Sequence, residues 1–229
     1  MRRLIFVLCF LGFLTAIGVA QQFDLVIEDG RVLDPETGLD AVRNVGIRGG
    51  KILCVSAEAL SGRRVVHAGG LVVAPGFIDL HQHGQDMASQ RVKALDGVTT
   101  ALELEIGAPD VARFLQSKEG HSLIHYGTSA SHVAARALVF GAPLPAEVIG
   151  PKAGIPDILP KSGAATDLPA TPEQIEAIQQ RLRAELDAGG LAIGMGIQYT
   201  PGATRSEVIA MFRLAAERGL PVYTHMRSA

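Results

Sequence analysis

The chain has 229 residues, enough for one or two domains, and 48% hydrophobic with 19% charged residues is a composition that can bury a core. Its 21 basic and 23 acidic residues give a formal net charge of -2, which offers no electrostatic footprint for nucleic acid or an anionic membrane surface. The composition therefore argues against a disordered chain and against partners of those two kinds.

The first twenty residues have the pattern of an export signal. Two arginines precede an uncharged apolar run, residues 4–19, and small residues end the run at Ala20. We expect a signal peptide over 1–20, a mature chain that begins near Gln21, and a secreted or periplasmic protein. The alternative is a retained membrane anchor, but an apolar run of about 16 residues is shorter than the roughly 17 to 25 that usually span a bilayer.

Residues 21–75 predict a small β-domain, which we expect to be sandwich-like. Short β-branched runs alternate there with turns, and Gly49-Gly50 lies between two such runs as a hairpin signal. His67 stands alone and is interpreted as structural. Cys54 is the one cysteine that follows the signal segment, so we expect no disulfide within the mature chain.

From residue 76 onward the pattern changes to strands that alternate with helices. The expected strands, each a short apolar or β-branched run, are 77–80, 98–102, 123–126, 191–193 and 221–224. This alternation predicts parallel strands with crossover helices, and so an α/β fold: a partial (β/α)8 TIM-type barrel of about five βα units over 76–229. An irregular insertion rich in Pro, Gly and Ala is expected near 141–170.

Two helices late in the chain have clear start signals. Thr171-Pro172 with Gln174 predicts an N-cap, a first-turn proline and a capping box, and Thr204 with Glu207 repeats the pattern. The stripe expected to be buried on the second of these helices is Val208, Phe212 and Ala215.

Side chains that can bind a metal follow three of the expected strands. His81 and His83 are two residues apart at a strand end, so both imidazoles project to one side, where they can share a zinc ion. Glu103 and Glu105 alternate in the same way at the end of the next strand, and His225 ends the fifth. Carboxylates inside a barrel are costly to bury unless a cation or a partner compensates them. The alternative is an amphipathic edge strand with both carboxylates in water.

Four segments together resemble a known family. Ala74–His83, Asp96–Thr100, Gly194–Gly202 and Tyr223–Arg227 look like the successive motifs of the amidohydrolase superfamily, and the nearest branch is that of the D-aminoacylases, the N-acyl-D-amino-acid deacylases. The similarity runs from about residue 23 to the end of the chain.

The resemblance implies a zinc site of one or two ions. His81 and His83 would be ligands, an acidic or thiolate residue at the end of the second strand would be a ligand or bridge, and His225 would bind at the fifth strand. D-aminoacylases have a cysteine after the second strand, and this chain has none there. Glu105 or Glu103 is the expected substitute, with Glu105 preferred because it lies nearer the strand end.

The resemblance also implies residues that contact substrate. Tyr199 matches a position near the acyl-amino-acid pocket, and Arg227 has the guanidinium fork that suits a substrate carboxylate, although ordinary loop or solvent roles remain open for both. The three histidines that match no motif are interpreted as structural, namely His121, His125 and His132.

The activity implied is that of a metal-dependent hydrolase that cleaves the C–N amide bond of a small acylated amino acid, most of all an N-acyl-D-amino acid. Zinc would lower the pKa of a water molecule and polarise the amide carbonyl. The family's sixth-strand His and general-base Asp would lie beyond residue 229, so we expect an N-terminal fragment that is inactive alone. The alternatives are a cyclic amidase or deaminase of the same superfamily and a non-catalytic exported remnant.

Overall fold

The structure is a computed structural model that describes residues 22–142 and 163–227. The chain divides into two compact units, Met1–Pro75 and Gly76–Ala229, and each is described by itself. The expected signal peptide over 1–20 lies outside the described residues, as does most of the expected irregular insertion near 141–170.

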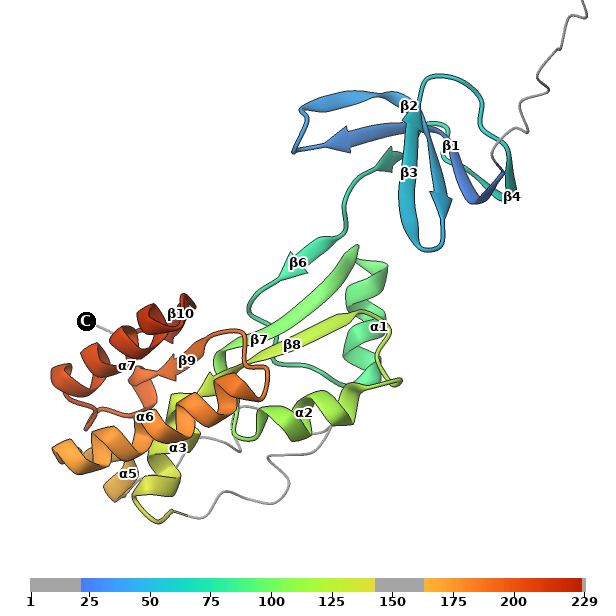
Figure 1. Cartoon of the computed structure of the whole chain (residues 1–229). Helices are drawn as coiled ribbons and strands as arrows, with labels where there is room; N and C mark the ends of the chain where they lie inside the picture. The colour runs from blue at the N-terminus through green and yellow to red at the C-terminus, as the bar shows by residue number, and fades with distance from the viewer. Residues whose placement is uncertain (1–21, 143–162, 228–229) are drawn as a thin grey trace, which may run out of the picture. The chain divides into compact units, whose positions relative to one another are not determined.

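The first unit is built on the long strand β1 (Phe23–Asp34), which has neighbours on both sides. On one side β2 (Leu39–Arg48) pairs with it in antiparallel register, and β3 (Lys51–Ser56) pairs with β2 in the same sense. On the other side β4 (Gly62–His67) and β5 (Val72–Val73) pair with successive parts of β1 in parallel. The result is a single mixed sheet (blue to teal in Figure 1), where the sequence had suggested a sandwich-like arrangement.

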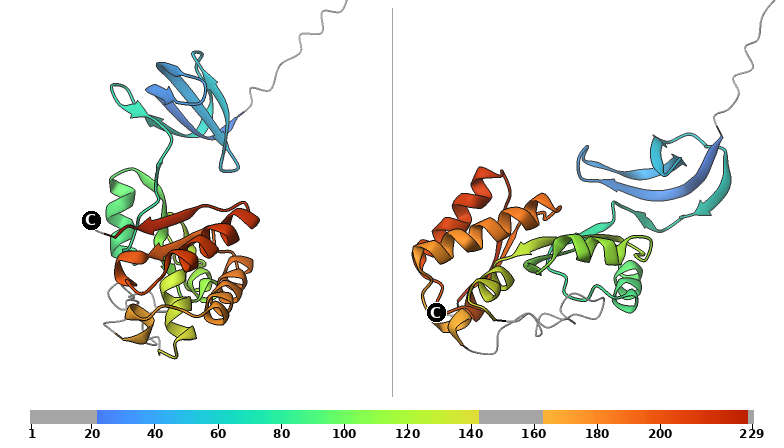
Figure 2. Two further views of the ribbon diagram at one scale, coloured as in Figure 1. Left: turned by 90° about the vertical axis from the view of Figure 1, so that its left-hand side faces the viewer. Right: turned by 60° about the horizontal axis from the view of Figure 1, so that its bottom comes forward.

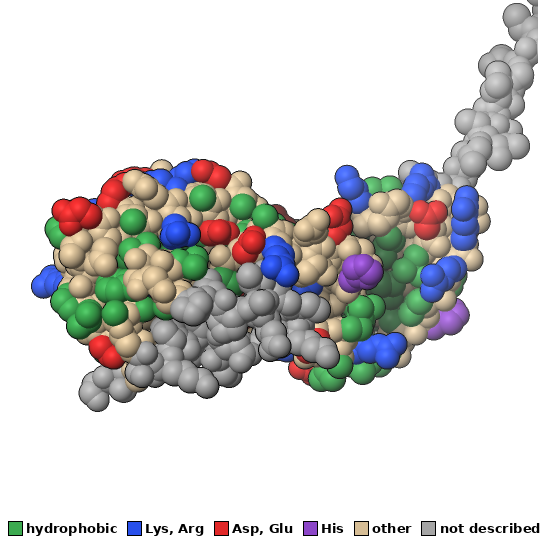
Figure 3. Space-filling model, turned by 90° about the horizontal axis from the view of Figure 1, so that it is seen from below, with side chains coloured by type: hydrophobic (Ala, Val, Ile, Leu, Met, Phe, Trp, Pro, Cys, Tyr) green, Lys and Arg blue, Asp and Glu red, His purple; other side chains and the backbone are tan. Residues whose placement is uncertain are grey.

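Two glycine features shape this sheet. Gly49 and Gly50 join β2 to β3 with φ angles of 57° and 74°, the conformation of a two-residue hairpin turn whose twist matches that of its strands. Gly46 makes room for the ring of Phe23, since a Cβ at Gly46 would lie 2.7 Å from that ring. The unit buries a small apolar set and leaves other apolar side chains exposed among its charged residues (right-hand part of Figure 3). The buried set comprises Phe23, Val26, Val32, Val45 and Ala68.

The second unit is a five-stranded parallel sheet whose strands lie side by side in chain order, with β6 and β10 at its edges (Figures 1 and 2). Its strands are β6 (Phe77–Asp79), β7 (Val98–Ala108), β8 (His125–Ser131), β9 (Ile193–Gly196) and β10 (Val222–His225). Every neighbouring pair is parallel. This is the α/β fold class predicted for the chain, about five βα units of a (β/α)8 barrel, and the prediction is confirmed.

The helices of this unit connect successive strands. They are α1 (Met87–Leu95), α2 (Val111–Lys118), α3 (His132–Val139), α5 (Ala164–Asp167), α6 (Pro172–Asp187) and α7 (Arg205–Glu217), with the 3-10 turn η2 (Ile197–Tyr199) after β9. The predicted start of α6 is confirmed, because Thr171 and Gln174 form a reciprocal capping box with Pro172 in the first turn. None of the described helices combines the length and the apolar character that a bilayer crossing requires.

The main core lies between α6, α7 and the middle strands. Side chains from α3, α6, α7, β8 and β9 form one buried cluster, and α6 contacts α2, α3 and α7 as well as β8. Its fully buried members include Ile178 and Leu182 of α6, Met195 of β9, and Met211 and Leu214 of α7. This cluster holds the outer helices against the sheet.

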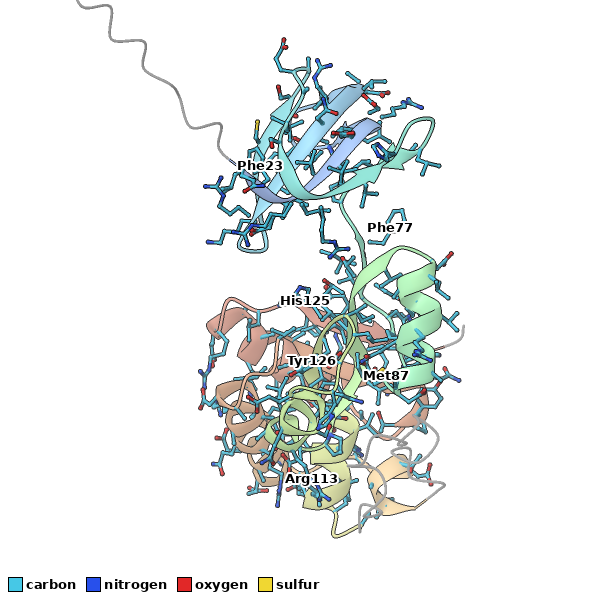
Figure 4. The ribbon with its side chains drawn as sticks, turned by 90° about the vertical axis from the view of Figure 1, so that its right-hand side faces the viewer. Phe23, Phe77, Met87, Arg113, His125 and Tyr126 are labelled. Atoms are coloured by element: carbon cyan, nitrogen blue, oxygen red, sulfur yellow. The ribbon has the colours of Figure 1, made fainter. Side chains whose placement is uncertain are left out.

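Three sequence expectations about these elements were wrong in position. The fourth strand was expected over 191–193 but runs from Ile193 to Gly196. The third strand was expected over 123–126 but runs from His125 to Ser131 (its start is labelled in Figure 4), because hydroxyl groups line its buried part. Thr128 donates a hydrogen bond to the carbonyl oxygen of Glu103 at 3.1 Å, and Ser129 donates to that of Leu104 at 2.8 Å. Because the backbone of β7 accepts hydrogen bonds from these buried hydroxyls, the strand can be buried without a run of apolar residues.

The buried face of α7 differs from the expected stripe at one residue, since Ala215 is buried and Val208 packs against the core as expected. Phe212 was expected to be buried but is 50% exposed, whereas Met211 and Leu214 are fully buried. Glu207, expected as a capping residue, is itself fully buried and turns inward to meet charged groups of α3. Glu207, Met211 and Leu214 therefore lie on the same buried face of α7.

Candidate metal centre

Two imidazoles stand directly after β6, at the carboxyl end of the parallel sheet. The Nε2 atoms of His81 and His83 lie 2.8 Å apart, and their rings meet edge to face with centroids 4.6 Å apart. The backbone N–H of Gln82, between them, donates to the carbonyl oxygen of Leu102 on β7 at 3.0 Å. The pairing with β7 thus places both rings beside the carboxylates of that strand.

Glu105 is the carboxylate that meets these two imidazoles. Its side chain is almost completely buried, and its Oε2 atom lies 2.8 Å from Nε2 of His81 and 3.2 Å from Nε2 of His83. Within the described part of the chain, these three residues form the set of possible metal ligands whose atoms all lie within 4.8 Å of one another. Two imidazole nitrogens and one carboxylate oxygen directed at one point are donors of the kinds that zinc takes, so the residues fit the ion that the resemblance implies.

His225 approaches the same carboxylate from the other side. It ends β10, and its Nδ1 atom contacts Oε1 of Glu105, the oxygen that does not face His81 and His83. His225 lies outside the three-residue set but is joined to it through Glu105. The two oxygens of one buried carboxylate therefore face imidazoles from different strands.

Glu103 has a different partner. Its Oε2 atom lies 2.7 Å from Nδ1 of His83, the ring nitrogen that faces away from Glu105, and its Oε1 accepts a long 3.4 Å hydrogen bond from the backbone N–H of Ile106. Burial raises the pKa of the Glu103 carboxyl, although the hydrogen bond and charge of His83 act in the opposite direction. Among the described residues, Glu103 is not part of the close set of ligand atoms.

Tyr199 completes one side of the centre. It lies in η2, directly after β9, and its hydroxyl oxygen is 3.5 Å from Nδ1 of His225. The centroids of the two rings are 4.8 Å apart. Six of the seven site residues expected from the sequence are thus brought together, and the seventh, Arg227, is engaged differently.

Arg227 donates hydrogen bonds to main-chain carbonyls of the segment after β9. Its Nη2 donates to the carbonyl oxygens of Ala203 at 2.7 Å, Thr200 at 3.2 Å and Pro201 at 3.3 Å, and its Nε donates to that of Ile197 at 3.3 Å. The guanidinium thereby holds the segment that carries Tyr199. These bonds engage Nε and Nη2, and the expected contact of Arg227 with a substrate carboxylate stays a prediction.

A second charged cluster, formed by His132, Arg136 and Glu207, was not foreseen. All three side chains have no exposed surface, and the carboxylate of Glu207 binds Nε2 of His132 at 2.9 Å and Nη1 of Arg136. Burial alone would raise the pKa of Glu207, but the hydrogen bonds and charges of His132 and Arg136 outweigh it and keep that pKa below its ordinary value. The sequence held one sign of this cluster: His132 and Arg136 are four residues apart, a spacing that puts both side chains on one face of a helix.

No protein-family model matches this chain, but curated proteins of known activity are similar to it. Over 219 residues, 91% of its length, the chain is 32% identical to an N-acyl-D-glutamate deacylase of Alcaligenes xylosoxydans xylosoxydans, of which it covers 44%. It is 29% identical over 224 residues to a D-aminoacylase of the same organism, of which it covers 45%.

A solved structure agrees with these relatives. The N-acyl-D-glutamate deacylase from Bordetella bronchiseptica, complexed with zinc and a phosphonate inhibitor, matches with a TM-score of 0.71 and 24% identity over 91% of this chain and 46% of that one. The chain therefore shares the fold of about half of that structure. The resemblance to the D-aminoacylase branch is confirmed by the curated relatives, and the chain spans about half of their length.

Proposed function

We propose that this chain contributes the metal-binding half of a hydrolase that cleaves the C–N amide bond of N-acyl-D-amino acids. The observation that carries the proposal is Glu105, a buried carboxylate whose two oxygens meet His81 and His83 on one side and His225 on the other. Such a carboxylate is costly to bury without a compensating cation. The names of the similar proteins supply the substrate class.

The residues of the chain have separate tasks in this proposal. Glu105, His81, His83 and His225 would hold the one or two zinc ions that the resemblance implies. Zinc, when bound, supplies Lewis-acid chemistry that polarises an amide carbonyl and makes a water molecule more acidic. Tyr199, whose hydroxyl lies beside His225, would hold the acyl-amino-acid substrate at the edge of the centre.

The general base is assigned to no residue of this chain. The resemblance implies an Asp from the last barrel strand and a His from the sixth, and the five strands of the described parallel sheet include neither. We therefore propose that the 229-residue polypeptide binds metal but does not turn over substrate by itself.

The test combines metal analysis with an activity assay. We expect the purified chain to retain zinc after dialysis and Glu105→Gln to lose most of it, because the amide supplies no negative charge and one oxygen in place of two. Glu176→Gln, which alters an exposed glutamate of α6, is the matched control and should retain zinc like the unaltered chain.

Activity is then measured on N-acetyl-D- and N-acetyl-L-amino acids and on cyclic amides, with this chain and with any longer form that its gene encodes. Hydrolysis of the D-compounds by a longer form supports the proposal. Turnover of cyclic amides alone would assign the protein to the cyclic amidases or deaminases of the superfamily. Zinc binding without turnover of any of these compounds by the longer form would indicate a non-catalytic remnant.

A further inference from the structure

We propose that Glu103 is a positioning residue of the metal centre: it binds no metal, but holds His83 in the tautomer and orientation that direct Nε2 at Glu105 and His81. The inference rests on the proposed metal site and assigns the two carboxylates of β7 to different tasks. The sequence favoured Glu105 as the ligand only because it lies nearer the strand end. It assigned no separate task to Glu103, because the two residues alternate on the same face of one strand.

The first argument is the arrangement around the ring of His83. A neutral imidazole carries one N–H and one lone pair, and a carboxylate can only accept a hydrogen bond. Because Nδ1 of His83 lies 2.7 Å from Oε2 of Glu103, the proton belongs on Nδ1. In the neutral ring, the form that binds metal, the lone pair is then on Nε2, which lies 3.2 Å from Oε2 of Glu105 and 2.8 Å from Nε2 of His81.

The second argument is that Glu103 is itself fixed and fully used. Its backbone carbonyl accepts a hydrogen bond from Thr128 of β8, and its backbone forms a bridge with that of His81. One carboxylate oxygen serves His83 and the other faces the N–H of Ile106. Glu105 differs, since both of its oxygens point to imidazoles of the centre.

The third argument is energetic. A carboxylate that accepts from the far nitrogen of a metal-binding imidazole fixes the ring and increases its basicity, and loss of such a partner typically weakens metal binding about 10–100-fold. His83 needs this support because its side chain is 37% exposed and follows a strand of three residues. The buried carboxylate of Glu103 therefore supplies a rigidity that the loop after β6 does not.

The experiment compares Glu103→Gln with Glu105→Gln in the same chain. Zinc affinity is measured by competition with a chelator, and zinc content at saturation is measured by elemental analysis. We expect Glu103→Gln to bind as much zinc as the unaltered chain at saturation, with an affinity lowered about 10–100-fold. Glu105→Gln should instead lose zinc at saturation. Glu103→Asp, which keeps the charge, should restore part of the affinity.

A second measurement determines the tautomer of the His83 ring in the absence of metal. Nitrogen-15 NMR of His83 in the zinc-free chain should show the Nδ1–H tautomer, and in Glu103→Ala a mixture of the two tautomers; Glu103→Gln serves as the folded reference if the alanine variant does not fold. Unchanged affinity in Glu103→Gln, or zinc content lowered as in Glu105→Gln, would overturn the inference. If the unaltered chain bound no zinc, the proposed function would fail, whereas the tautomer measurement would still decide the role of Glu103.

Discussion

Arg227 illustrates how one side chain can order a functional loop. Its guanidinium donates to four carbonyl oxygens between Ile197 and Ala203, the segment in which Tyr199 lies beside His225. Arginine suits this task because its donors form a rigid planar fork, whereas the lysine ammonium is a point charge on a flexible stem. The position of Tyr199 thus depends on a residue two positions beyond His225 in the chain.

We predict that Arg227→Gln loosens this loop and leaves the metal centre intact. The amides of Thr200 and Ala203 should exchange faster with solvent in hydrogen-exchange mass spectrometry, the free energy of unfolding should fall by about 1–2 kcal/mol, and zinc affinity should stay the same. Arg218→Gln is the matched control, because Arg218 pairs with Asp187 on the surface. Equal exchange in both variants would disprove the anchoring role.

The sequence predicted most of the site residues because strand periodicity fixes which side chains share a face. Two pairs of residues, each two positions apart, stand at the ends of neighbouring strands: His81 with His83, and Glu103 with Glu105. Because these strands pair in parallel, the two pairs lie close together. Two features could not be predicted. The hydrogen-bond partner of each imidazole nitrogen depends on the register between neighbouring strands, and the contacts of Arg227 depend on the conformation of the loop after β9.

At the scale of helices and strands, the cluster of His132, Arg136 and Glu207 joins α3 to α7. Arg136 also donates from Nε to the carbonyl oxygen of Ala165 at 2.6 Å, and so reaches α5. Nδ1 of His132 has no hydrogen-bond partner within the described residues. Three buried polar side chains thus tie together helices that are distant in sequence.

We predict that Glu207→Gln lowers the free energy of unfolding by about 3–5 kcal/mol at pH 7, because the guanidinium of Arg136 stays buried without its counter-charge. The pKa of Glu207 is lower in the folded chain than its ordinary value of 4.5, so the contribution of its charge is complete above that value. It is lost as the pH falls through the folded pKa. Urea unfolding between pH 7 and pH 3 measures the difference.

The control for this prediction is Glu217→Gln, an exposed glutamate at the end of the same helix, which should change stability little at any pH. A gap between the unaltered chain and Glu207→Gln that stays constant down to the lowest pH would contradict the assignment.

At the scale of the whole molecule, two units with separate cores share one chain. The β unit buries a few side chains around Phe23 and Val26, whereas the barrel unit has a larger cluster around Ile178, Leu182 and Met211. Export through the segment 1–20 and a secreted or periplasmic location stay predictions.

We predict that Leu182→Ala destabilises the barrel unit by about 2–5 kcal/mol, because it leaves a cavity at a fully buried position of α6. Amide protection should fall in α6, β9 and α7 and persist in β1 and β2, as mapped by hydrogen exchange. Leu95→Ala is the control, since Leu95 is 90% exposed, and it should change stability by less than about 0.5 kcal/mol. Loss of protection throughout both units would show one cooperative fold.

The alternation of strands and helices was predictable, since caps such as that of Thr171 and glycine turns are local signals. The exposure of Phe212 on α7 was not predictable, because a stripe through Phe212 is as periodic as the observed one through Met211. The inward position of Glu207 depends on partners about 70 residues away.

Because the ring of Tyr199 contacts that of His225, the absorption and fluorescence of this tyrosine can report on the metal centre. The sequence has three tyrosines and no tryptophan, so tyrosine dominates its near-ultraviolet absorption and emission. Tyr199 lies at the centre itself, and Tyr223 is two residues before His225 on β10. Two of the three phenols thus report on this corner of the sheet, and titrations can follow their fluorescence without a label.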